Sequence, residues 1–274
     1  MQVRQLQRKS IEYRKAILRS IKSAKAGHTA GSLSCIDILN VLYNYVMDIT
    51  PQNFSSTERD RYVQSKGHSV EALYVVLADQ GFFPASELDT LSRFQSHFVG
   101  HPTRKVPGVE HNTGALGHGL SVSVGLAMGA KISDSPHRVY TLLGDGELAE
   151  GSSWEALMAA CHYKLDNLVI IVDRNGLQIT GATEDVMGLE PLAEKFAAFG
   201  CAVNGCDGND VAALVRAFDR LPFERGKPNL LLARTIKGAG VSFMEDVVKW
   251  HHKVPADDEY QAALAELEIA ESAL

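Results

Sequence analysis

Two polar side chains, each placed just after an apolar run, have the clearest chemical use in this sequence. Gly-Asp145-Gly follows one apolar run, and Asn175 follows the next. If these runs are neighbouring parallel strands, their carboxyl ends meet at the edge of the sheet where ligands bind. There the Asp145 carboxylate, the Asn175 amide oxygen and the backbone carbonyl of Leu177 could share Mg²⁺ and leave positions for ligand phosphates. A plain strand-to-helix turn also explains Gly-Asp-Gly alone, but the pair favours a cation site.

The elements that must position this pair alternate along the chain. Helical periodicity covers residues 3–25, 34–47, 69–80, 115–131, 150–164, 190–199 and 209–220. Short β-rich runs lie at residues 139–143, 168–172 and 230–235. Strands that alternate with helices predict an α/β fold, a parallel sheet with helices on both faces. No repeat or linker interrupts the pattern, so we expect residues 1–274 to form a single domain.

Composition excludes several classes of protein. The chain has 274 residues, 45% of them hydrophobic, and a formal net charge of −6. That balance is typical of a globular protein and argues against a nucleic-acid partner, which requires clustered basic residues. No apolar run reaches the roughly 18 residues that a membrane helix requires. Four cysteines without C-x-x-C spacing are too sparse for a disulfide scaffold in a chain of this length, so we expect a cytoplasmic protein.

The two ends of the chain carry opposite charge. Residues 4–25 contain eight basic side chains and one acidic one, which is typical of a transit peptide. The spacing of Tyr13, Ile17, Ile21 and Ala24 favours a structural first helix instead. Residues 255–274 contain acidic but no basic side chains, and we expect a terminal helix with a solvated acidic face.

Beyond the cation site, five sequence blocks resemble one family in its own order. They are residues 26–32 (AGHTAGS), 60–68 (DRYVQSKGH), 100–102 (GHP), 108–119 (GVEHNTGALGHG) and the segment from Gly144-Asp145-Gly146 to Asn175. Together they resemble the amino-terminal half of transketolase, a thiamine diphosphate enzyme. The resemblance covers nearly the whole chain and implies the diphosphate-binding domain of that fold.

The resemblance implies how a cofactor would be held. It assigns Mg²⁺, which Ca²⁺ or Mn²⁺ could replace, to Asp145, Asn175 and the Leu177 carbonyl. The residues implied to contact thiamine diphosphate are His68, Gly114, Leu116, Asp145, Gly146, Asn175, Ile179, Lys237 and His251. Ile179 would form the apolar wall at the thiazolium ring. Lys237 would face the diphosphate, although it could equally be a solvated loop lysine.

The histidines gain a role only through the resemblance. Taken singly, each of the ten is an ordinary surface or hydrogen-bonded residue, and no H-x-H or H-E-x-x-H spacing predicts a metal cluster. By resemblance, His28 and His101 line the sugar channel and His251 touches both the cofactor and the donor sugar. All three would serve as hydrogen-bond donors and proton shuttles. His118 and His252 depart from the family, which commonly has glutamine and glycine there, so substrate preference could differ.

The resemblance implies transfer of a two-carbon ketol unit from a ketose to an aldose, and also an incomplete chain. The pyrimidine-binding domain, whose glutamate activates the cofactor, is not found in this sequence, and neither is the carboxy-terminal domain. We therefore expect a second transketolase subunit that carries both, with two copies of each chain. Glu150 and Glu155 resemble interface residues of the family, although Glu155 could simply favour the helix amino terminus.

Three other functions remain open at this point. A subunit of a 2-oxo acid dehydrogenase would share Gly-Asp-Gly and the asparagine, but not the blocks around His28, His68 and His101. Deoxyxylulose phosphate synthase is a further relative, although its chain includes both thiamine-binding domains. A non-catalytic assembly or regulatory subunit would keep the fold, but it would not need Asp145 and Asn175 as cation ligands. The sugar substrate, a phosphate or a modified sugar, does not follow from this sequence.

Overall fold

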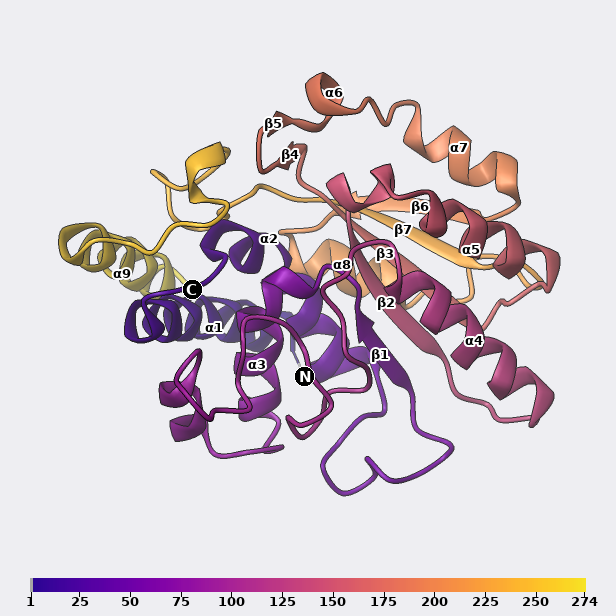
Figure 1. The fold of residues 1–274 in the computed structure, drawn as a ribbon, viewed down its shortest axis with the longest axis horizontal. Coiled ribbons are helices and arrows are strands. Elements are labelled where there is room, and N and C mark those ends of the chain that lie inside the picture. Colours follow the sequence, from indigo (N-terminus) through magenta and orange to yellow (C-terminus); the bar gives the residue numbers. More distant parts are fainter. Residues whose placement is uncertain (1) are drawn as a thin grey trace.

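The centre of the molecule is a five-stranded parallel sheet with strand order β1-β2-β3-β7-β6 (Figure 1). The computed structural model describes residues 2–274. The strands are β1 (Arg61–Gln64), β2 (Val139–Gly144), β3 (Leu168–Arg174), β6 (Ala202–Asp207) and β7 (Asn229–Arg234). A hairpin of β4 (Leu177–Gln178) and β5 (Gly181–Ala182) lies outside the sheet. The predicted α/β class with a parallel sheet is confirmed.

Helices cover both faces of this sheet (Figure 1). One face carries α1 (Val3–Ala24), α2 (Thr29–Val41), α3 (Val70–Asp79), α8 (Val211–Phe218) and α9 (Asp257–Ser272). The other carries α4 (Gly119–Ile132), α5 (Gly151–His162) and α7 (Leu192–Phe199). Shorter helices are η1 (Leu42–Val46), η2 (Gly67–Ser69), η3 (Ala85–Thr90), η4 (Gly146–Ala149), α6 (Thr183–Val186) and η5 (Val248–Trp250). Within residues 2–274, no helix is long and apolar enough to cross a bilayer.

The side-chain alternation of β3 explains why the sheet has two cores. Val169 and Ile171 pack into the core that includes α1 and α2, whereas Ile170 and Val172 pack into the core that includes α4 and α5. Successive side chains of a strand point to opposite faces. A strand that is apolar from Leu168 to Val172 therefore requires helices on both sides, as the sequence predicted.

Strands β2 and β3 are parallel neighbours joined through α5, as their spacing predicted. Gly144 at the end of β2 pairs with Asp173 near the end of β3. Asp145 and Asn175 follow these two positions and leave the sheet at the same edge. The topology thus brings together the two side chains that the sequence singled out as cation ligands.

The structure departs from the predicted elements at two strands of the sheet, at the β4–β5 hairpin and at two helix starts; the helix predicted over residues 34–47 begins earlier, at Thr29. β1 and β6 were not predicted, because β1 has only four residues and β6 contains Asn204 and Gly205. The helix predicted from residue 115 begins at Gly119, since Gly114 and Gly117 have positive φ angles of 133° and 82°. Few side chains tolerate that backbone conformation, so the chain stays irregular up to the helix start.

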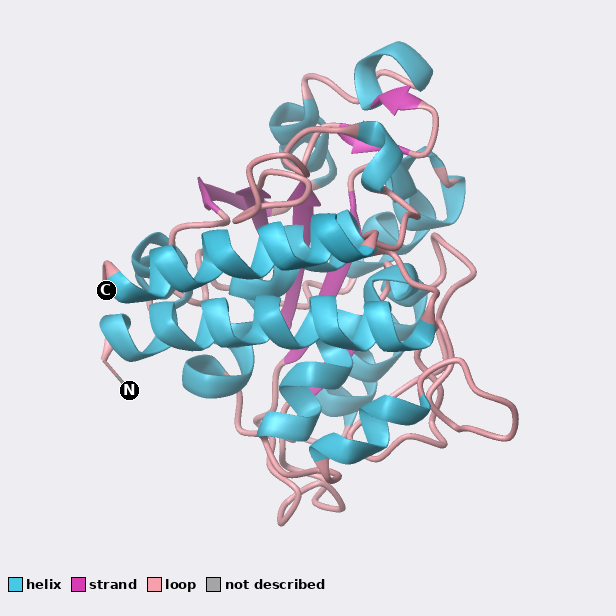
Figure 2. Ribbon diagram, turned by 90° about the vertical axis from the view of Figure 1, so that its left-hand side faces the viewer, coloured by secondary structure: helices cyan, strands magenta, loops and turns pink. Residues whose placement is uncertain are grey.

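The first and last helices lie side by side (Figure 2). α1 buries Tyr13, Ile17 and Ile21, which confirms the predicted structural helix. The predicted terminal helix with an acidic, solvent-facing side is present as α9. Glu271 forms an ion pair with Lys15 at 2.8 Å, and Asp257 pairs with Lys22 at 2.6 Å. Two basic side chains of α1 are therefore paired with α9.

Candidate functional site

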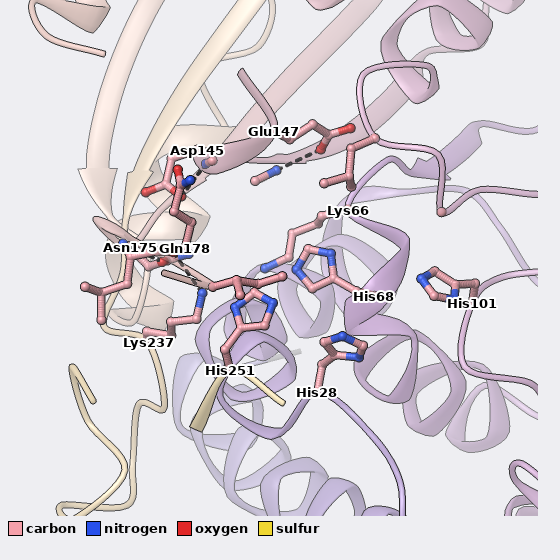
Figure 3. A pocket seen from close by; sticks show the side chains of 16 residues that line it. His28, Lys66, His68, His101, Asp145, Glu147, Asn175, Gln178, Lys237 and His251 are labelled. Atoms are coloured by element: carbon pink, nitrogen blue, oxygen red, sulfur yellow. Dashed lines mark hydrogen bonds between the residues drawn. The ribbon is translucent and has the colours of Figure 1, made fainter. Parts of the chain in front are cut away.

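A cavity of about 310 Å³ lies at the carboxyl edge of the sheet, where the loops after β1, β2 and β3 meet (Figure 3). It is lined by His28, Lys66, His68, His101, Gly114, Leu116, Gly144, Asp145, Gly146, Glu147, Asn175, Leu177, Gln178, Ile179, Lys237 and His251. Every residue predicted to contact the metal, the cofactor or the sugar is among them. Lys66, Gly144, Glu147 and Gln178 were not predicted.

At one end of the cavity, Asp145 is held by three donors. Its Oδ1 accepts a hydrogen bond from the backbone N–H of Gly146 at 2.8 Å, and its Oδ2 accepts one from Gly176 at 2.6 Å. The Arg174 guanidinium donates to the same Oδ2 at 3.1 Å. Burial, together with the nearby charge of Asp173, raises the pKa of Asp145. A desolvated carboxylate fixed in this way is well suited to bind a cation.

Two further oxygen atoms lie next to Asp145. The Asn175 Oδ1 accepts the N–H of Leu177 at 3.1 Å, and the Leu177 carbonyl accepts a hydrogen bond from Lys237 Nζ at 2.9 Å. That carbonyl thus already faces a positive charge. Within residues 2–274, no three His, Cys, Asp or Glu side chains are arranged to share a metal ion. One carboxylate with amide and carbonyl oxygens is instead the ligand chemistry that suits Mg²⁺.

Lys237 is a buried lysine and not the solvated loop residue of the alternative interpretation. Only 3% of its surface is exposed. Burial, followed by the charge of Lys66, lowers the pKa of Lys237 to about 8. Lys237 therefore carries a positive charge at neutral pH and can pair with an anionic group in the cavity.

Lys66 forms a buried ion pair beneath the cavity. Its ammonium contacts the Asp173 carboxylate and donates to the carbonyl of Gly31 at 3.1 Å. Burial alone would lower the pKa of Lys66, but Asp173 outweighs it and holds that pKa above its usual value. Asp173 also accepts from Ser34 Oγ at 2.7 Å and from Thr235 Oγ1. The pair therefore ties α2 to the ends of β1, β3 and β7.

Glu147 connects three segments around the cavity. Its carboxylate accepts hydrogen bonds from Gly117 N at 2.8 Å, Gly144 N at 3.0 Å and the hydroxyl of Ser65. The carboxylate is buried, and burial raises its pKa. By binding these donors, Glu147 fixes the backbone turn that carries Gly114 into the cavity. At Gly114 a Cβ would come within 2.6 Å of the His101 ring, so the close approach requires glycine.

Four imidazoles gather at the other end of the cavity (Figure 3). The ring centroid of His28 lies 5.3 Å from that of His68, 5.5 Å from that of His251 and 6.3 Å from that of His101. Burial lowers the pKa of all four, to about 4 for His28 and about 3 for His251. At neutral pH these rings are uncharged, and each can donate one hydrogen bond and accept another.

The remaining predicted residues lie at the edge of this site or outside it. Ile179 lines the cavity, and 69% of its surface is exposed. Glu150 and Glu155 are exposed and do not line the cavity. His118 binds the carbonyl of Leu116 through Nδ1 at 3.0 Å and lines a separate hollow.

Glu71, which was not predicted, holds the segment that carries His28. Its carboxylate accepts from His28 N at 3.3 Å and from Ser32 Oγ at 2.9 Å. Burial raises the pKa of Glu71 from 4.5 to about 7. The folded chain therefore keeps this proton at pH values where the unfolded chain has released it.

We expect Glu71→Gln to remove part of the pH dependence of stability. In the wild type, the contribution of Glu71 is fully present below pH 4.5 and is lost as the pH rises through 7. As the pH rises from 4.5 to 7, the free energy of unfolding of the variant should increase relative to that of the wild type, by up to about 3 kcal/mol. Urea unfolding at a series of pH values measures the difference. Exposed Glu58→Gln is the matched control, and parallel curves for Glu71→Gln and the wild type would contradict the prediction.

Comparison with known proteins shows to which family this arrangement belongs. Residues 7–270 match the family model "Transketolase, thiamine diphosphate binding domain". The chain belongs to the transketolase family. The resemblance of the five sequence blocks is thereby confirmed, and the cavity lies in the domain that the family model describes as binding thiamine diphosphate.

Transketolase relatives differ in how much of their length the chain matches. It is 49% identical over 267 residues to a subunit of the apulose-4-phosphate transketolase of Phocaeicola vulgatus, covering 97% of this chain and 95% of that protein. It is 41% identical to the 6-deoxy-6-sulfo-D-fructose transketolase subunit SqwG of a Clostridium species, covering 96% of both. The solved transketolase of Leishmania mexicana superposes with a TM-score of 0.85 at 26% identity, covering 100% of this chain but 45% of that one.

Proposed function

We propose that this chain is the diphosphate-binding subunit of a two-subunit transketolase, which moves a two-carbon ketol unit from a ketose to an aldose acceptor. The observation that carries the proposal is the division of the cavity into two ends (Figure 3). One end holds the oxygen atoms of Asp145, Asn175 and Leu177, and uncharged imidazoles extend from His251, beside Lys237, to His101 at the other end. A cofactor anchored at the first end would present its reactive part beside the second.

The residues of the first end fit Mg²⁺ and thiamine diphosphate. Asp145, Asn175 and the Leu177 carbonyl would bind the metal ion, and Ca²⁺ or Mn²⁺ could replace it. Lys237 and the backbone at Gly114 and Gly146 would face the diphosphate and the rest of the cofactor. When bound, the cofactor supplies the carbon nucleophile and the electron sink that carbon–carbon bond cleavage needs.

The chain itself would orient the sugar and move its protons. His28, His101 and His251 can each accept a proton from one sugar hydroxyl and donate one to another, because all three rings are uncharged at neutral pH. Buried Nδ1 atoms of His28 and His251 have no hydrogen-bond partner within residues 2–274. Two unpaired polar atoms at the same end of the cavity indicate a polar ligand.

A second subunit would complete the enzyme. Two relatives whose length the chain matches almost fully are named as transketolase subunits. We propose a cytoplasmic assembly of two copies of each chain, in which the partner supplies the pyrimidine-binding and carboxy-terminal domains. Glu150 and Glu155 are exposed on and beside α5 and are available for that interface. The names of these relatives favour a branched or otherwise modified ketose as the donor.

Reconstitution tests the proposal directly. The chain should show no ketol transfer alone, and should become active when mixed with a companion chain that carries the pyrimidine-binding domain, in the presence of Mg²⁺ and thiamine diphosphate. Ketose consumption and aldose formation are the measurements. Full activity of the isolated chain would overturn the proposed division of the enzyme between two chains. No Mg²⁺-dependent cofactor binding by the mixture, measured by calorimetry, would instead indicate a non-catalytic subunit.

A further inference from the structure

A fifth imidazole lies against the four that line the cavity. The ring centroid of His252 is 4.5 Å from that of His28, closer than any of the three cavity histidines that contact His28. His252 does not line the cavity and is exposed to solvent. It therefore lies outside the cavity lining, with its ring against that of His28.

The loop that carries His252 is fixed on both sides. Before it, Trp250 is fully buried and donates its indole N–H to the carbonyl of Phe243 at 3.1 Å. After it, the carbonyl of Lys253 accepts a hydrogen bond from Thr29 Oγ1 at 2.6 Å, next to His28 in the sequence. The ammonium of Lys253 also lies 4.0 Å from the centre of the Trp250 ring. These contacts hold the backbone of His252 in a fixed place beside His28.

The ring of His252 packs against the ring of His28, and this contact leaves its two nitrogens available. No hydrogen bond joins its ring nitrogens to another residue in the described part of the chain, 2–274. An imidazole offers one donor and one acceptor, or two donors when it is charged. Because His28 and His252 are in contact, two neighbouring hydroxyl groups of one polyol could each bind one of these rings.

We propose that His252 determines substrate specificity by binding a sugar hydroxyl next to the one bound by His28. This inference rests on the proposed ketol transfer and extends it to a residue outside the cavity. It assigns the substrate class as a polyhydroxylated ketose or aldose with a hydroxyl group at that position. Loss of His252 should weaken sugar binding and leave the cofactor end of the cavity intact.

The test compares His252→Ala and His252→Gln in the complex with the companion subunit. We expect His252→Ala to raise the KM for the sugar about 5- to 10-fold, the size of one neutral hydrogen bond, with kcat changed less than about 2-fold. Glutamine keeps one donor and one acceptor, so His252→Gln should restore part of the affinity. His162→Gln, at the exposed end of α5, is the matched control and should match the wild type.

Two readouts separate the inference from the proposed function. Calorimetric affinity for thiamine diphosphate and Mg²⁺ should be the same in the wild type and both His252 variants. Wild-type complex that binds cofactor but transfers no ketol unit would overturn the proposed function. Wild-type complex that is active, with the KM of His252→Ala unchanged, would overturn the role of His252. The role of His252 would also be overturned if removal of a sugar hydroxyl weakened binding equally to the wild type and to His252→Ala.

Discussion

Replacement of Asp145 by asparagine should weaken Mg²⁺-dependent binding of thiamine diphosphate at least about 100-fold. Even residues that only support a metal ligand change affinity 10- to 100-fold when removed, and here the ligand's charge itself is lost. Asparagine keeps the shape of the side chain and an oxygen that can accept from the N–H of Gly176. The change therefore isolates the negative charge that a hard divalent cation requires.

Calorimetry with the complex of both subunits measures this loss, and electron paramagnetic resonance of Mn²⁺ gives an independent value for the metal. Asp89→Asn is the matched control, because Asp89 is exposed on η3 and does not line the cavity. Its affinities should equal those of the wild type. If Asp145→Asn bound cofactor and Mn²⁺ as tightly as the wild type, the cation site would have to lie elsewhere.

Lys66→Met should lower the free energy of unfolding by about 3–5 kcal/mol, because it leaves the Asp173 carboxylate buried without its cation. Asp173 is fully buried, and 1% of the Lys66 side chain is exposed. Burial raises the pKa of Asp173, but Lys66 and the hydroxyl donors outweigh it and keep the pKa below its usual value. Without Lys66 the carboxyl must become protonated or remain unpaired.

The double variant Lys66→Met/Asp173→Asn tests the reason for this loss. It removes both charges and should recover a large part of the lost stability, which urea unfolding measures. Exposed Lys105→Met is the control for the loss of a lysine and should stay close to the wild type. Equal stability of Lys66→Met and the wild type would show that the pair contributes nothing to the fold.

The cation end of the site was predictable because it depends on local rules. Asp145 and Asn175 each follow an apolar strand, and parallel strands joined by one helix bring their carboxyl ends together. The alternation of apolar strands with helices also predicted the α/β class and a sheet that is covered by helices on both faces. Roles of the histidines, by contrast, came only from the resemblance, since no spacing along the chain places His28 beside His251.

Residues that the sequence did not reveal act through contacts with distant segments. Lys66 depends on Asp173, and Glu147 binds the backbone of Gly117, each across several elements. Glu147 directly follows Gly-Asp-Gly, and this position beside the motif was the one sequence feature that could have pointed to it. Strand β1 lacked a recognisable pattern, because its four residues begin with arginine and end with glutamine. Pairing with β2, and not local preference, makes it a strand.

The pairing of the first and last helices makes the surface of α1 depend on a segment that is distant in the sequence. Lys15 and Lys22 of α1 pair with Glu271 and Asp257 of α9, and the two helices pack together. A proteolytic cut that removed residues 257–272 would therefore leave both ammonium groups without these partners and uncover the part of α1 on which α9 packs. Protease resistance at this face thus depends on both helices together.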